Sequence, residues 1–578
     1  MKTASRSTPA RLTAPATDKL SRFLLLALLV LYIVAGLFGR DPWKIDDVAS
    51  LASMLSALQY GYAAWFLPQV GPSILADGGP VVTWVGASLI YLMDPWISPL
   101  ITYRFTNLLW FALMAWTLWY GAYLLGRRPE TQPLALPFGG EPSEKDYGRM
   151  LADVALLLLL GTVGILVKIH EVSELPAALA WQAIAVCAVA RMVDKPRLGS
   201  TFLGLALAGM FLTRGWPGIA PILLALLIIF IQSGPLARTR GWLAWSGLLS
   251  FILVLAWWWP ASQIQGSWMT HFIHWNETYY GLPQADALLR PIRDLPWFLW
   301  PTWPLAMIAI WKWRAWISSP HILIPASFAI SVLLLLFMTR DAGDIDFAML
   351  VIPCALLAAF SLPTLRRGLI NTLDWFSLMC FSLTVLTVWL GWLSLHFKLL
   401  PQIHQNIMRL TAGYTPGIQW WPVVAGIVVT LGWVAMIVWR VKANPTALWR
   451  GSALCASGIT ATWVLMVLLW MPAVDYVRSY RPMSKQVYQA IERFKADSLS
   501  APCVRAQGLS LGPRASLYVF DGITFSYESS CPLVLQQTTL RQLRDGSAGY
   551  SEGTTVLWQG SRAADRFDRY RLLRIDAK

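Results

Sequence analysis

An unusual group of ionisable residues follows the first long apolar run of the chain. Residues 40–49 read Arg-Asp-Pro-Trp-Lys-Ile-Asp-Asp-Val-Ala, which places three carboxylates, an arginine and a lysine together. Ionisable groups beside a bilayer are costly unless they are solvated, paired or used. An enzyme that transfers a group to a hydroxyl or amine needs a carboxylate to accept the proton, or to hold a metal that does so. Asp46 and Asp47 are therefore the candidate catalytic residues.

The same two aspartates have a simpler interpretation as helix caps. They precede an amphipathic run from Val48 to Tyr60. An aspartate at the start of a helix satisfies free backbone amides and the helix dipole. The two interpretations are compatible, and the residues alone leave both open.

A second polar cluster lies between residues 168 and 174, where an apolar run ends. It reads Lys-Ile-His-Glu-Val-Ser-Glu and contains His170, Glu171 and Glu174. If this segment and Asp46 lie on the same side of a membrane, their acidic groups could face one cavity. The alternative is that these residues are solvated charges at the membrane interface.

Three basic residues are candidates for binding a phosphate, namely Arg214, Lys168 and Arg340. The planar fork of an arginine matches a phosphate well. Arg214 stands between Thr213 and Gly215, at a predicted break in a helix. The alternative is that each cation only extends its side chain to the membrane surface.

Other ligand and cofactor patterns are weak or missing from the sequence. His271 and His274 are spaced for one helix face, but no third ligand stands at a suitable spacing, which favours a structural role. There is no Walker motif, dinucleotide-binding glycine pattern or zinc ribbon. The sequence therefore argues against an ATP-driven pump and indicates no cofactor, although the acidic residues are compatible with a divalent metal.

The composition is that of a polytopic membrane protein. The 578 residues are 56% hydrophobic and only 13% charged, whereas soluble domains carry about 25% charged residues. Mean hydropathy is +0.52. The net charge of +15 comes from short basic clusters between apolar runs. That distribution indicates membrane topology and no nucleic-acid partner.

The charge pattern predicts about thirteen transmembrane helices. A spanning helix needs about 20 apolar residues, and short loops rich in Lys and Arg stay in the cytoplasm. Basic residues before Phe23 place the N-terminus inside, so the first helix, near 21–39, delivers Asp46 to the outer side. Short juxtamembrane helices are expected over 48–90, a helical hairpin broken at 213–217, and a long outer loop over 263–293.

Three regions follow from this pattern: a basic cytoplasmic tail at 1–20, a transmembrane domain at 21–472 and a small soluble α/β domain at 473–578. Strand-like runs in the last region are Ala515–Phe520, Cys531–Leu535 and Thr554–Trp558. The final helix leaves this domain outside. In an oxidising compartment Cys503 and Cys531 could form a disulfide that closes a loop of 28 residues.

The chain resembles the GT-C glycosyltransferases that take a sugar from a polyprenyl phosphate. The resemblance is closest to the bacterial aminoarabinose transferases of lipid A and the protein O-mannosyltransferases. Four segments carry it: Arg40–Asp47, similar to Arg-x-Pro-Asp-Glu; His170–Pro176, similar to a second acidic loop; Phe211–Gly215, similar to Phe-Leu-Thr-Lys-Gly; and Leu295–Pro301. The resemblance implies that Asp46 is the catalytic carboxylate, with Asp47 in place of a glutamate.

The chain also departs from that pattern. The aminoarabinose transferases have Glu-Lys-Pro-Pro in the first outer loop, where this chain has Gly78-Gly79-Pro80-Val81. An Arg and a Glu that follow the acidic pair are replaced by Ala49 and Ala52. Contacts to a carrier phosphate must therefore come from other residues, and the sugar and acceptor need not be aminoarabinose and lipid A.

Residues and resemblance together predict an inverting glycosyltransferase of the bacterial inner membrane. Its donor would be a sugar on polyprenyl (undecaprenyl) phosphate, and its acceptor a lipid, glycan or protein on the periplasmic side. The alternative is a transporter or flippase of lipid-linked envelope intermediates. A transporter would place its acidic residues near mid-bilayer in broken helices related by a repeat. The acids of this chain lie at predicted outer boundaries, and no repeat is visible.

Overall fold

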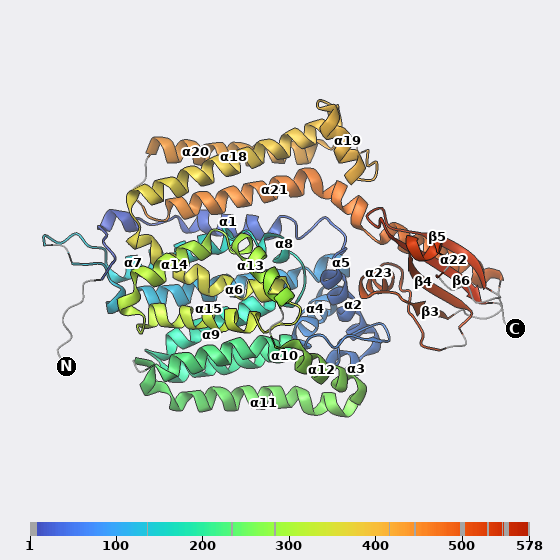
Figure 1. Ribbon diagram of the computed structural model, residues 1–578, viewed down its shortest axis with the longest axis horizontal. Helices are drawn as coiled ribbons and strands as arrows, with labels where there is room; N and C mark the ends of the chain where they lie inside the picture. The colour runs from blue at the N-terminus through green and yellow to red at the C-terminus, as the bar shows by residue number, and fades with distance from the viewer. Residues whose placement is uncertain are drawn as a thin grey trace.

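The structure is a computed structural model that describes most of the chain. The described residues are 8–135, 137–232, 235–282, 285–415, 417–443, 447–497, 503–528, 531–545, 547 and 554–575. Long helices lie roughly side by side in one bundle, and a small sheet domain projects from one end of it (Figure 1). We call that end the domain end, and the end near residues 8–21 the far end.

Twelve of the 24 described α-helices form the bundle. Its members are α1 (Arg22–Val34), α6 (Phe105–Gly126), α7 (Glu144–Leu160), α9 (Glu174–Met192), α10 (Pro196–Ile231), α11 (Gly241–Ile264), α14 (Thr302–Lys312), α15 (Pro320–Leu336), α17 (Val351–Ser361), α18 (Arg367–Phe397), α20 (Trp420–Ala443) and α21 (Arg450–Arg478). Eight helices among the described residues are long and apolar enough to cross a membrane. The chain is thus an α-helical polytopic membrane protein, as its composition predicts. The count of thirteen spans remains a prediction, since helices such as α1 and α14 are short.

Helix α10 contains the predicted break. Arg214 (φ −140°, ψ 15°) and Gly215 (φ 57°, ψ −145°) leave helical geometry, so α10 is two helices joined at a kink. A positive φ favours glycine, which has no Cβ to clash. Ser246 of α11 donates to the carbonyl of Ser200, so the beginning of α10 lies beside the helix that follows its end. The chain therefore reverses at Gly215, as expected for a hairpin.

Short elements cluster around the domain end, where they connect the long helices. They are α2 (Ile45–Tyr60), α3 (Tyr62–Phe66), the antiparallel pair β1 (Gln69–Val70) and β2 (Ser73–Ile74), α4 (Val81–Met93), α5 (Pro99–Thr102), α8 (Ile165–Lys168), α12 (Gly266–Tyr279), α13 (Ala285–Phe298), α16 (Asp344–Ala348) and α19 (Pro401–Leu410). Helices are thus present where juxtamembrane helices are expected after Asp46. The expectation of a loop over 263–293 is wrong, because α12 and α13 occupy most of it. Aromatic packing among Trp257, Trp268 and Phe272 holds α12 against α11.

The C-terminal region forms a mixed sheet with helices. Its elements are α22 (Arg481–Asp497), β3 (Val504–Gln507), α23 (Leu511–Asp521), β4 (Leu533–Thr539), α24 (Leu540–Arg544), β5 (Thr554–Gly560) and β6 (Asp568–Ile575). The strand order is β3-β4-β6-β5; β3 pairs with β4 in parallel, with Val504 opposite Leu533, and the other pairs are antiparallel. A disulfide joins Cys503 to Cys531, with Cα atoms 5.2 Å apart. Helix α21 continues past residue 472 to Arg478, so one helix links the bundle to this region.

One predicted strand is a helix. Residues 515–520, expected as a strand, lie within α23. Ala515 and Tyr518 are buried on one helix face against Val48 and Ala52 of α2, and this spacing fits a helix and not an extended strand. Helix α23 ends at Gly522, which adopts a left-handed conformation (φ 65°) typical of a helix end.

The C-terminal domain rests on the helix that begins with the acidic pair. The hydroxyl of Tyr518 donates to Gln59 at 2.6 Å, and Arg514 donates to Ser73 at 3.2 Å. A second attachment lies before α2, where Arg481 donates to the carboxylate of Asp41 at 3.0 Å. These contacts fix α2 from the side opposite the transmembrane helices.

Residues 8–21 pack against the far end of the bundle. The amide of Leu134 donates to the carbonyl of Ala10, and the amide of Leu448 donates to that of Ala16. Short 3₁₀ helices turn the chain here and elsewhere: Ala14–Thr17, Pro129–Thr131, Pro235–Thr239, Arg314–Trp316 and Leu362–Thr364. The last residues of the predicted tail are therefore an ordered part of this end, and residues 1–7 lie outside the described residues.

Candidate functional site

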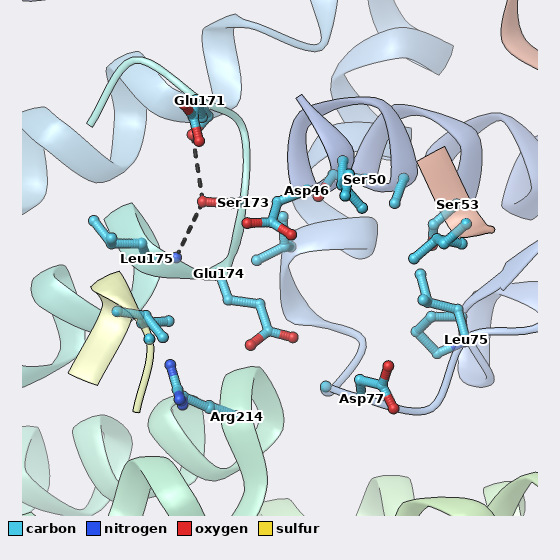
Figure 2. Close-up of a pocket in the computed structure, with 18 of the residues that line it drawn as sticks. Asp46, Ser50, Ser53, Leu75, Asp77, Glu171, Ser173, Glu174, Leu175 and Arg214 are labelled. Atoms are coloured by element: carbon cyan, nitrogen blue, oxygen red, sulfur yellow. Dashed lines mark hydrogen bonds between the residues drawn. The ribbon is translucent and has the colours of Figure 1, made fainter. Parts of the chain in front are cut away.

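A polar cavity of about 730 Å³ lies at the domain end of the bundle. Helix α2, the segment before α4, residues 168–175, the kink of α10, and parts of α12, α13, α16 and α23 surround it. Figure 2 shows Asp46, Glu174 and Arg214 around this space. Its ionisable lining residues are Asp46, Asp77, Lys168, Glu171, Glu174, Arg214, Arg290, Asp341 and Asp344.

The two adjacent aspartates have different surroundings. Asp46 is exposed and lines the cavity. Asp47 is fully buried, and its carboxylate forms an ion pair with Arg40 at 2.8 Å. Successive residues of a helix point about 100° apart, so the first turn of α2 directs one carboxylate into the cavity and the other into the protein.

Asp47 joins two segments that are far apart in the sequence. Besides Arg40, it accepts hydrogen bonds from the hydroxyl of Tyr103 at 3.3 Å and from the amide of Val172 at 3.0 Å. Arg40 in turn donates to the carbonyl of His170 at 3.0 Å. Asp47 therefore holds the segment after α1 against the segment before α9, and so fixes the position of Asp46.

Glu171 is the member of the second cluster that contacts cations. Its carboxylate lies 3.5 Å from the Nζ of Lys44 and 3.4 Å from the Nζ of Lys168. Lys168 also contacts Asp344 of α16 at 3.0 Å. Burial raises the pKa of Glu171, while the two lysines act in the opposite direction. Asn107 of α6 fixes this segment by donating to the carbonyl of Glu171 at 2.9 Å.

His170 lies behind the cavity wall and is not among its lining residues. Its ring is buried, with Nδ1 2.6 Å from the carbonyl of Leu166 and Nε2 2.8 Å from that of Tyr32. It also packs on Trp463, with ring centroids 4.7 Å apart. Burial lowers the pKa of His170 to about 4, so the ring is neutral near pH 7 and serves to pack α1 against α8 and α21.

Glu174 and Asp77 approach the cavity from opposite walls. In Figure 2 the carboxylate of Glu174 points into the space between Asp46, Asp77 and Arg214. A side chain at Gly78 would overlap that carboxylate, so a glycine there permits the close approach. The neighbouring amide of Gly79 donates to the carbonyl of Thr213 at 2.9 Å, which joins the loop to the α10 kink. Burial raises the pKa of Asp77.

Arg214 lies at the kink of α10 and faces the cavity. Its Nη2 donates to Asp346 of α16 at 2.9 Å and to the hydroxyl of Tyr279, and its guanidinium lies over the ring of Tyr279. Asn276 of α12 accepts from the amide of Trp216 at 2.6 Å and so caps the second half of α10. Side chains of α12 and α16 thus hold Arg214 and the kink at the edge of the cavity.

Arg340, the third cation predicted to contact a phosphate, is exposed and is not among the residues that line the cavity. Its amide donates to the carbonyl of Tyr279 at 3.2 Å. His271 and His274 are exposed on α12. Arg290 lines the cavity instead, and its Nη1 lies 3.4 Å from Asp341. Sequence reasoning missed Arg290, Asp77 and the acids of the 341–346 segment.

The described part of the chain contains one group of potential metal ligands with close ligand atoms, formed by Cys503, Glu528 and Cys531. Both cysteines belong to the disulfide, so this group is a structural link. The carboxylates of the cavity are more widely spread. Six acidic and three basic side chains line it, which makes it a predominantly acidic space with cations at its edges.

The fold and this cavity define a class: a polytopic helical membrane protein with a polar site between its juxtamembrane helices and a soluble C-terminal domain. Comparison with solved structures makes this more specific. ArnT from Cupriavidus metallidurans bound to undecaprenyl phosphate matches with a TM-score of 0.65 and 15% sequence identity, over 95% of this chain and 97% of that one. The apo form of the same protein matches with a TM-score of 0.64, over the same fractions of the two chains.

The chain therefore has the fold of ArnT over 95% of its length. The resemblance to the aminoarabinose transferases, suggested by four short segments, is confirmed at the level of the fold. No protein-family model and no curated protein sequence matches the chain. The likeness thus lies in the structure and not in overall sequence similarity.

Proposed function

We propose that this protein is a glycosyltransferase that moves a sugar from a polyprenyl (undecaprenyl) phosphate carrier to an acceptor lipid, glycan or protein. The observation that carries the proposal is the exposed carboxylate of Asp46 in a cavity that Lys168 and Arg214 also line. The fold supports it, since ArnT with the same architecture was solved with undecaprenyl phosphate bound.

Asp46 is the proposed catalytic base. In the proposed reaction its carboxylate accepts the proton of the acceptor hydroxyl or amine as that atom bonds to the anomeric carbon. The bond between the anomeric carbon and the phosphate oxygen breaks at the same time, and polyprenyl phosphate leaves with the bonding electrons. Attack from the face opposite the leaving group inverts the anomeric centre. Asp47 supports the reaction by fixing the turn that carries Asp46.

The leaving phosphate gains negative charge, and fixed cations stabilise it in the transition state. Arg214 and Lys168 line the cavity and are held there by Asp346, Glu171 and Asp344. Arg290 is a third cation in the cavity lining. We assign the carrier phosphate to Arg214 and Lys168. We assign the sugar or the acceptor to Glu174, because the carboxylate of Glu174 points into the open space of the cavity.

The proposed location is the bacterial inner membrane with the cavity on the periplasmic side. The basic clusters of the sequence support an N-terminus in the cytoplasm. The disulfide between Cys503 and Cys531 supports an oxidising compartment for the C-terminal domain. In that orientation the carrier's sugar and the acceptor meet at the outer surface of the membrane.

The test begins with the product, because neither sugar nor acceptor is specified by the cavity. Mass spectrometry of envelope glycans and glycolipids, with and without the protein, is expected to reveal one sugar-modified species that depends on it. Asp46→Asn should then abolish that species while the protein reaches the membrane normally. Asp94→Asn is the matched control, since Asp94 is exposed at the end of α4 and does not line the cavity. An Asp46→Asn protein with wild-type transfer would refute the assignment of the base.

A further inference from the structure

A second, apolar groove of about 650 Å³ lies between α1, α6 and α7. Leu26, Leu29 and Val30 of α1 form one wall, and Leu108, Phe111 and Ala112 of α6 form the other. Leu26 and Val30 are about 60% exposed, so the groove is open to the surroundings of the bundle. Its lining on α1 extends from Arg22 to Val34, which at 1.5 Å per residue corresponds to about 18 Å.

The groove has one charged end. Arg22, at the start of α1, and Arg149, in the first half of α7, both line it. Asp153 also lines the groove; its carboxylate accepts from the indole of Trp119 at 2.8 Å and lies 3.9 Å from Arg149. Two arginines thus outweigh one aspartate. The rest of the groove is formed almost entirely by apolar side chains.

The charged end lies at the far end of the bundle, away from the Asp46 cavity. Helix α1 begins there at Arg22 and ends at Val34, just before the segment that leads to Asp46. Tyr32 stacks on Phe111, with ring centroids 5.9 Å apart, and the indole of Trp463 donates to the carbonyl of Ala35 at 2.7 Å. These contacts fix the end of α1 nearest the cavity. The groove and the cavity have no lining residue in common, so they are separate spaces.

We propose that this groove binds an anionic phospholipid of the membrane leaflet on the side of the N-terminus. One acyl chain lies along α1 and α6, and the phosphate binds to Arg22 and Arg149. An arginine fork suits a phosphate, and basic pockets between membrane helices on the cytoplasmic side recognise anionic headgroups. The polyprenyl carrier does not fit this description, because its phosphate is needed at the Asp46 cavity. The choice of a phospholipid over the carrier rests on the proposed function, whereas binding of an anionic lipid in the groove does not require the transfer reaction.

The test is a lipid titration of the purified full-length protein in detergent, followed by native mass spectrometry. Dioleoyl phosphatidylglycerol and dioleoyl phosphatidylcholine have the same tails and differ in net charge. We expect phosphatidylglycerol to bind about tenfold more tightly than phosphatidylcholine. The variants Arg22→Gln and Arg149→Gln should each weaken phosphatidylglycerol binding about fivefold. This loss is equivalent to about 1 kcal/mol per basic residue. Arg127→Gln is the matched control, since Arg127 is exposed at the end of α6 and does not line the groove.

A second variant tests the apolar part. Ala112 is exposed and lines the groove, so Ala112→Trp should fill the groove without disturbing buried packing. The affinity for each lipid should fall at least fivefold. Equal binding of the two lipids, or unchanged phosphatidylglycerol binding in both Arg22→Gln and Arg149→Gln, would overturn the proposal. So would loss of undecaprenyl phosphate binding in Ala112→Trp, because the groove would then belong to the carrier.

Discussion

Asp46 and Asp47 are adjacent in the chain, yet the first carboxylate faces a polar cavity and the second is fully buried against Arg40 at 2.8 Å. The pair therefore divides two tasks between neighbouring residues. One aspartate is available to a substrate, and the other holds the first turn of α2 in place. The interpretation of the two aspartates as capping residues is wrong, because Lys44 is the N-cap residue of α2 and no side chain caps the helix; both aspartates lie in its first turn. The catalytic interpretation of Asp46 stays a proposal.

Asp47→Asn should destabilise the protein. Breaking a buried ion pair by removing one partner costs about 3–5 kcal/mol, because the other charge stays buried and unpaired. Thermal unfolding of the purified protein should show a clear fall in midpoint for Asp47→Asn. Asp46→Asn should change it little, since Asp46 is exposed. An equal midpoint for both variants would contradict a structural role for Asp47.

Arg214→Gln should lower the transfer rate at limiting donor concentration by about 100-fold or more, the usual effect of losing one fixed donor to a developing oxyanion. Arg214→Lys keeps the charge and should lose less. Tyr279→Phe removes a hydroxyl that contacts Arg214 and Asp346 but no charge, and should stay within about tenfold of wild type. Once the product is known, initial rates over a range of donor concentrations test this; a Gln variant within threefold of wild type would exclude Arg214.

Gly215→Ala should destabilise the α10 kink by about 1–3 kcal/mol, because Gly215 has a φ of 57° that other residues rarely adopt. The added methyl would also overlap the Oδ1 of Asn276. Gly247→Ala in α11 is the control, as no described atom lies within 4 Å of a Cβ there. The midpoint of thermal unfolding and the transfer rate should both decrease in Gly215→Ala and stay unchanged in Gly247→Ala. Unchanged stability in both would show that the kink tolerates a side chain.

His170 makes stability depend on pH. Its pKa is about 4 in the folded protein, because burial disfavours the charged ring, against about 6.5 when unfolded. Between these values the unfolded state binds more protons, so stability falls as pH is lowered from about 6.5 to 4, by up to about 3 kcal/mol. Unfolding measured across this range should show the slope. His170→Gln should reduce it, whereas His274→Gln, at an exposed position, should retain it.

Cys503→Ser should loosen the C-terminal domain. The disulfide closes a loop with a sequence separation of 28 residues, which corresponds to about 3.6 kcal/mol of stability. Limited proteolysis should release fragments of this domain faster from the variant, and from reduced wild-type protein, than from the untreated protein. Cys380→Ser is the control, since Cys380 is free and exposed. Labelling of Cys503 by a thiol reagent in untreated protein would contradict the bond.

The sequence predicted local features well. The helix break at 213–217 was readable because Gly215 and Pro217 interrupt an apolar run, and glycine and proline act through their own backbone geometry. The charges that end each apolar run likewise indicated a multi-span membrane protein. Strand-like composition misled at 515–520, where signals for a helix were also present: Pro513 in its first turn and Gly522 at its end.

Contacts between distant segments could not be predicted from the sequence. Arg214 and Asp346 are 132 residues apart, and their ion pair depends on how α16 packs beside the α10 kink. Asp77 reaches the cavity from a loop and Arg290 from α13, and no local pattern specifies how these two segments pack. The assignment of different roles to Asp46 and Asp47 also needed the structure, because both residues have the same side chain and the same local sequence.

The support of α2 by the C-terminal domain has a consequence for how the protein is made. Asp41 is held by Arg481, 440 positions later, and α2 packs on α23. The ribosome finishes these partners only near the end of synthesis. A nascent chain that has already inserted its helices therefore still lacks the support for the Asp46 segment. A chain that stops before α23 lacks these contacts, so the segment that carries Asp46 is fully supported only after the C-terminal domain has been made.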